Sequence, residues 1–63
     1  MLLGCAGEEA FRRGKQSLSE GRPEQALAAF EQAVAENPGN VQFRTQLNKA
    51  REDAVNAILA NAE

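Results

Sequence analysis

The sequence contains no histidine, tryptophan or tyrosine, and its only cysteine is Cys5. A single thiol cannot form an internal disulfide, and without histidine the chain has no zinc-ligand set. It also has no serine–histidine or cysteine–histidine pair for nucleophilic catalysis. We therefore expect no catalytic residues, no metal site and no cofactor.

Long apolar runs and a strong excess of one charge sign are also missing. The formal net charge is −2, with seven basic and nine acidic residues. Such a chain has no basic footprint for nucleic acid and no strong attraction to anionic lipid. No apolar run approaches the roughly 20 residues of a membrane-spanning helix. We expect no nucleic-acid partner, and membrane contact only through a lipid anchor.

Most of the sequence consists of residues that favour helices, chiefly Ala, Glu, Gln, Leu and Arg. Apolar and small residues recur at helical spacing in three segments. Gly21 ends the first segment, and Pro23 suits the first turn of the second. Pro38 ends the second segment, and Asn40 is a good N-cap for the third. The pattern predicts helices over residues 8–20 and 23–37, and a third from Val41 almost to the end of the chain.

The second predicted helix resembles the second half of a tetratricopeptide repeat (TPR). The resemblance rests on the spacing of four residues, Ala26, Phe30, Ala33 and Pro38. Gly14 takes the small-residue position of the preceding helix, and Gly21 takes the turn, which completes the motif core. The resemblance implies an all-α fold in which residues 8–40 form one antiparallel helical hairpin. It also implies that Phe30 is deeply buried between Gly14 and Leu47.

The first predicted helix departs from the TPR pattern at three positions. Ala10 and Arg13 stand where the pattern has large apolar residues, and Ser17 stands where it has an aromatic one. Phe11 lies beside Ala10 and can supply the missing bulk. The alternative is a generic three-helix bundle that shares the alanine and phenylalanine spacing.

Residues 41–63 do not repeat the motif. Arg44, Leu47 and Asn48 stand where a second repeat would have large, large and small residues, and no glycine turn occurs near Val55. This segment is predicted to be either a long capping helix or a connector into further repeats of a longer protein.

The first residues carry a second resemblance. Leu2-Leu3-Gly4-Cys5 resembles a bacterial lipobox, although the basic region and longer apolar run expected before it are missing. The resemblance implies that Cys5 is lipidated, and Ala6 is similar to the residue found there in outer-membrane lipoproteins. The alternative is an ordinary disordered terminus with an inert thiol. In either case residues 1–7 are expected to be a disordered leader.

A lipobox followed by a TPR-like hairpin and a long helix also resembles the periplasmic start of secretin-type proteins of secretion or pilus systems. The implied location is the periplasm, with an outer-membrane anchor at Cys5. If the first residues are not native, the implied location is the cytoplasm.

The TPR resemblance implies a non-enzymatic scaffold that binds another protein. The first helix supplies three candidate contact residues, Arg12, Lys15 and Gln16. The alternative is a structural self-assembly element. In that case Val55, Ile58 and Leu59 form the interface of a homodimer, because the hairpin is too short to cover them. The overhanging ends of the third helix would then pack antiparallel.

Overall fold

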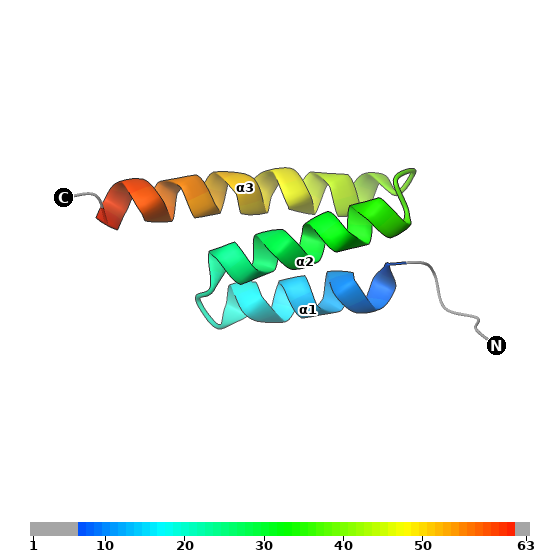
Figure 1. The fold of residues 1–63 in the computed structure, drawn as a ribbon, viewed down its shortest axis with the longest axis horizontal. Coiled ribbons are helices and arrows are strands. Elements are labelled where there is room, and N and C mark those ends of the chain that lie inside the picture. Colours follow the sequence, from blue (N-terminus) through cyan, green and yellow to red (C-terminus); the bar gives the residue numbers. More distant parts are fainter. Residues whose placement is uncertain (1–6, 62–63) are drawn as a thin grey trace.

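The computed structural model describes residues 7–61, which form three helices. These are α1 (Glu8–Ser19), α2 (Pro23–Glu36) and α3 (Val41–Asn61). α1 and α2 lie antiparallel, and α3 runs back along the other side of α2 (Figure 1). The described residues contain no strand. The predicted all-helical fold, a hairpin followed by a long third helix, is confirmed, although α1 and α2 each end one residue before the predicted boundary.

Two short turns connect the helices at the predicted places. Gly21 has a positive φ of 77°, a conformation that glycine adopts without the steric cost of a Cβ atom. Pro23 occupies the start of α2. After α2, Asn40 Oδ1 accepts a hydrogen bond of 3.0 Å from the backbone N–H of Phe43. Asn40 therefore caps the N-terminus of α3, as its position in the sequence predicts.

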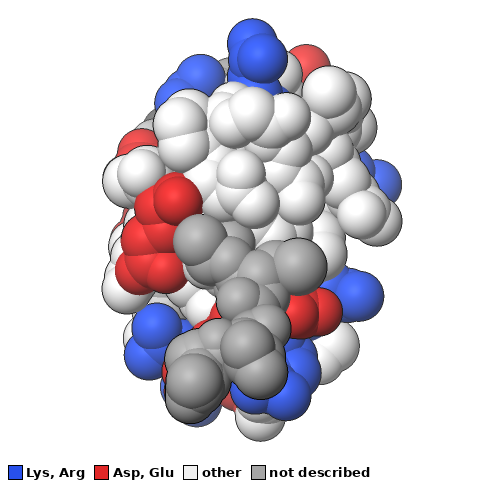
Figure 2. Space-filling view, turned by 90° about the vertical axis from the view of Figure 1, so that its right-hand side faces the viewer, with Lys and Arg blue, Asp and Glu red and all other residues white. Residues whose placement is uncertain are grey.

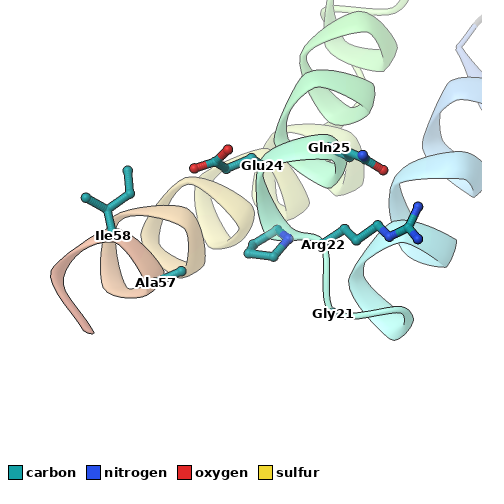
Figure 3. A pocket seen from close by; sticks show the side chains of 7 residues that line it. Gly21, Arg22, Glu24, Gln25, Ala57 and Ile58 are labelled. Atoms are coloured by element: carbon teal, nitrogen blue, oxygen red, sulfur yellow. The ribbon is translucent and has the colours of Figure 1, made fainter. Parts of the chain in front are cut away.

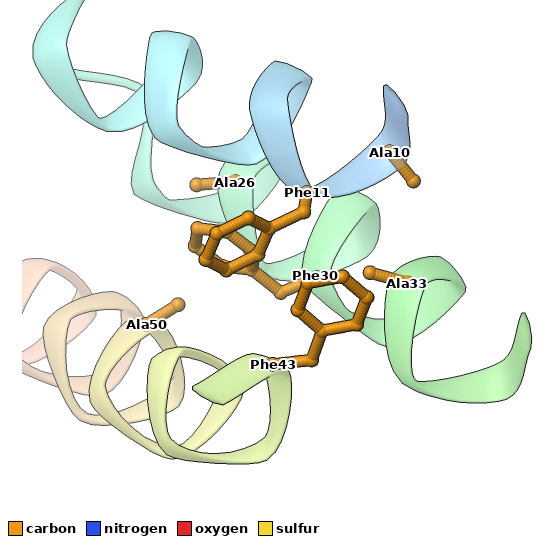
Figure 4. Close-up of a cluster of buried hydrophobic side chains, with 7 residues drawn as sticks. All are labelled: Ala10, Phe11, Ala26, Phe30, Ala33, Phe43 and Ala50. Atoms are coloured by element: carbon orange, nitrogen blue, oxygen red, sulfur yellow. The ribbon is translucent and has the colours of Figure 1, made fainter. Parts of the chain in front are cut away.

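Phe30 lies at the centre of the core and is fully buried, as are Ala26 and Ala33 on the same face of α2 (Figure 4). A Cβ atom added to Gly14 would lie 2.5 Å from a ring carbon of Phe30. The absence of a side chain at Gly14 thus allows α1 to approach the Phe30 ring. Leu47 packs against the same cluster from α3.

Three phenylalanines join the three helices (Figure 4). The Phe11 ring lies 5.5 Å from the Phe30 ring and stacks on Phe43 at 4.5 Å between centroids. Ala10 and Phe11 are both buried. Phe11 therefore supplies, one residue later, the bulk that Ala10 lacks. The extensive helix–helix contacts are those of α1 with α2 and of α2 with α3. This layered order, with α2 in the middle, is that of stacked repeat helices rather than of a closed bundle.

Gly7 requires a correction to the predicted leader. It is buried and precedes α1 with φ 82°, and its carbonyl accepts a 2.9 Å hydrogen bond from the N–H of Phe11. A Cβ atom on Gly7 would lie 2.7 Å from the carbonyl oxygen of Ala33 and 3.1 Å from the Phe43 ring. The packed unit therefore includes Gly7, because only a glycine fits between α2 and α3 in this backbone conformation. The rest of the predicted leader, including Cys5, lies outside the described residues.

Candidate protein-interaction surfaces

The three candidate contact residues of α1 are all exposed. Lys15 Nζ lies 5.3 Å from the centroid of the Phe11 ring, which keeps 9% of its surface exposed. Gln16 Nε2 donates a 3.2 Å hydrogen bond to Glu20 Oε2. The structure therefore places Arg12, Lys15 and Gln16 on the solvent side of α1, and it also gives Lys15 a cation–π contact with the core.

Charge is unevenly divided between the two helices of the hairpin. α2 contains no lysine or arginine, and its three carboxylates, Glu24, Glu31 and Glu36, are all exposed. α1 carries three basic residues after its acidic first turn. At the end of the molecule where α1 begins, basic and acidic groups lie around an uncharged area (Figure 2). The side of α1 is the more basic flank of the hairpin and the side of α2 the more acidic one.

α3 extends past the hairpin. It has 21 residues against 14 in α2, so at about 1.5 Å per residue it is about 10 Å longer. Ala54 is the last buried residue among residues 41–60 of α3. Beyond it, the side chains of Val55, Ile58 and Leu59 are 49%, 56% and 63% exposed. The hairpin therefore leaves them uncovered, and residues 55–61 are called the overhang below.

A hollow of about 320 Å³ lies between the α1–α2 turn and the overhang (Figure 3). One wall is the segment from Gly21 to Gln25, and the other is formed by Ala57 and Ile58. Ala57 points toward the turn, whereas Arg22 extends toward α1 (Figure 3). Arg22 is the N-cap residue of α2 and its side chain makes no capping hydrogen bond. We call this hollow the notch.

The residues of the motif core are structural. Gly14, Ala26, Phe30 and Ala33 are buried, and Gly21 and Pro38 lie in the two turns. The sequence pattern did not reveal the stacking of Phe11 on Phe43, the packing of Gly7 or the notch. The spacing of the phenylalanines is the only signal that could have suggested the first of these.

The described residues offer little chemistry. None of the polar or charged side chains in residues 7–60 is buried. The same residues contain no group of three or more Cys, Asp or Glu side chains that could hold a metal ion. No helix in the described part of the chain is long and apolar enough to cross a bilayer.

A helical hairpin with a small residue facing one aromatic ring, continued by a further antiparallel helix, is an arrangement found in helical-repeat proteins. The family model of the tetratricopeptide repeat matches residues 17–54, more than half of the chain. The chain belongs to the tetratricopeptide repeat family. Repeats of this family generally mediate protein–protein interactions and are typically not catalytic. No curated protein and no solved structure matches the chain.

Proposed function

We propose that the chain is a non-enzymatic scaffold that binds another protein through the exposed side of α1. The observation that supports protein binding most is the match to the TPR family, which covers residues 17–54, from the end of α1 through α2 to most of α3. The choice of α1 rests on the exposure of its basic residues. Such units present extended surfaces rather than enclosed sites. The basic residues Arg12 and Lys15 complement an acidic segment on the partner, which would raise the association rate and the specificity of binding.

Charge reversal on α1 tests this proposal. The variant Arg12→Glu with Lys15→Glu is compared with the wild type as bait, in cross-linking and mass spectrometry on extracts of the source organism. Glu31→Lys on α2 is the matched control, because it also reverses an exposed charge. Proteins captured by the wild type and the control but lost by the α1 variant are the expected result. If the α1 variant retains the same set, α1 is not the binding surface.

We propose further that Cys5 carries lipid and holds the scaffold at the periplasmic side of the outer membrane. The support is the lipobox-like Leu2-Leu3-Gly4-Cys5 followed by Ala6. Ala6 alone separates Cys5 from the buried Gly7, so the packed unit would lie close to the bilayer surface. Mass spectrometry of the native protein extracted from membranes should show an acylated N-terminal cysteine. An unmodified cysteine, or a mature terminus elsewhere, would exclude the anchor.

A role in a secretin-type secretion or pilus system is the most specific form of this proposal. It rests on the order of lipobox, TPR hairpin and long helix. Detergent extracts of the native membranes should then contain the chain together with an outer-membrane channel. If the two proteins separate under gentle extraction and chemical cross-linking does not join them, the chain does not have this role.

Self-assembly is the second candidate function. The observation that favours it is the exposure of Val55, Ile58 and Leu59 on the overhang. Sedimentation velocity over a wide concentration range separates the two candidates. A mass that rises with concentration supports self-assembly. A monomer at every concentration excludes self-assembly and leaves binding of another protein as the candidate function.

A further inference from the structure

The outer face of α3 differs from the corresponding face of α1. One repeat length of 34 residues after Ala10 and Gly14 lie Arg44 and Asn48. Ala10 and Gly14 are buried against α2, whereas Arg44 and Asn48 are exposed. A further helix packed on α3 as α2 packs on α1 would have to bury Arg44 and meet Asn48 in place of a glycine. The first half of α3 thus has the polar outer face typical of a terminal capping helix.

The second half of α3 has the opposite character. Residues 41–53 contain five charged side chains, whereas residues 54–61 contain none. This uncharged stretch includes the half-exposed Val55, Ile58 and Leu59. An occupant that covers only the last two turns of α3 would therefore bury apolar side chains of the overhang and no charged ones. A helix that covers the whole of α3 would also have to cover charged side chains.

We propose that the notch receives the overhang of a second copy of this chain, in a twofold-symmetric dimer. The inference rests on self-assembly, the second candidate function. An occupant of the notch lies beside α3 at the end where α2 begins. A helix placed there in line with α2 and in the same direction runs antiparallel to α3 (Figure 1). The overhang of a second copy is such a helix, and an antiparallel pair of identical segments closes on itself. Ala57 and Ile58 of the two copies then face each other.

The helix ends favour the same arrangement. The C-terminal end of the second copy's α3 would point at the N-terminus of α2. The N-cap residue of α2 makes no side-chain capping bond, and the last turn of α3 has no basic residue. The exposed N–H groups of one helix end and the carbonyl groups of the other carry opposite partial charges. Gly21 leaves room for this approach, because a Cβ atom built there has no atom within 4 Å.

The small size of the contact limits its strength. Two helical turns per copy bury far less than the roughly 1,200 Å² typical of stable complexes. We therefore expect a weak dimer, with a dissociation constant on the order of 100 μM or higher. This is weaker than an obligate dimer, and it is consistent with a core that is already buried within one chain.

Cysteine cross-linking tests the register of the contact. The variant Ala57→Cys is made in a Cys5→Ser background. It is treated with a short bismaleimide at a protein concentration near the dissociation constant of the dimer. Gln32→Cys, on the exposed side of α2, is the control. We expect Ala57→Cys to form covalent dimers many-fold faster than the control, and we expect Ile58→Glu added to Ala57→Cys to remove most of this difference. Because Ile58 is half-exposed, this change should leave the helical circular dichroism signal intact.

The two ways of failing are distinguishable. Equal cross-linking at both sites, in a protein that sedimentation shows to dimerise, would overturn the notch contact and leave self-assembly standing. A protein that sediments as a monomer up to millimolar concentration would overturn both. Neither result affects binding of another protein through α1.

Discussion

Replacement of Phe30 by alanine should remove most of the stability of the folded unit. The ring is fully buried, faces Gly14 and lies 5.5 Å from the Phe11 ring. Truncation removes these contacts and leaves a cavity beside Gly14, which has no side chain to fill it. Such a change costs about 3–5 kcal/mol. At 0.05–0.15 kcal/mol per residue, a chain of this size has a total stability of about 3–9 kcal/mol.

Urea denaturation followed by circular dichroism at 222 nm measures this loss. We expect Phe30→Ala to be largely unfolded without denaturant, because helices of this length are marginal when isolated. The control is Val41→Ala, which removes a side chain that is 70% exposed and should change stability by about 0.5 kcal/mol or less. An unchanged midpoint for Phe30→Ala would refute the placement of this ring at the centre of the core.

Four further substitutions test the backbone features that position the helices. Gly14→Ala should cost about 1–2 kcal/mol, because overpacking against the buried Phe30 ring exceeds the gain in helix propensity. Gly39→Ala, with no atom near the added Cβ and no positive φ, should melt within a few degrees of the wild type. Gly7→Ala should cost about 1–3 kcal/mol, since its φ is positive and the Ala33 carbonyl blocks the new atom. A wild-type melting temperature for Gly7→Ala would show that residue 7 does not pack on α2. Asn40→Ala should cost about 1 kcal/mol and speed hydrogen exchange at the Phe43 amide, and unchanged exchange would argue against the cap.

The helices and the central core residues were predictable because local chemistry determines them. Pro23 and Pro38 restrict the backbone wherever they occur, and helical spacing placed Ala26, Phe30 and Ala33 on one face. The predicted ends of α1 and α2 were one residue too late. The N–H of Glu20 is shared between the carbonyls of Gln16 and Ser17, which is typical of a terminating helix.

The remaining features depend on residues that are distant in the sequence. Gly7 follows small, uncharged residues and therefore looks like part of a leader, but its burial is due to Ala33 and Phe43. The contact of Lys15 with Phe11 depends on how that ring stacks. The uncovered end of α3 could be predicted from the relative helix lengths. The notch could not, because it also depends on the position of the α1–α2 turn.

The contact between Gly14 and the Phe30 ring is the feature on which the TPR packing depends, and one solution measurement observes it directly. In a nuclear Overhauser spectrum of the wild-type chain, the α-protons of Gly14 should show strong cross-peaks to the Phe30 ring protons. These α-protons should also be shifted well upfield by the ring current, because the ring atoms lie against this position. A folded, helical protein with Gly14 α-protons at ordinary chemical shifts and no cross-peak to Phe30 would contradict the packing of α1 on α2.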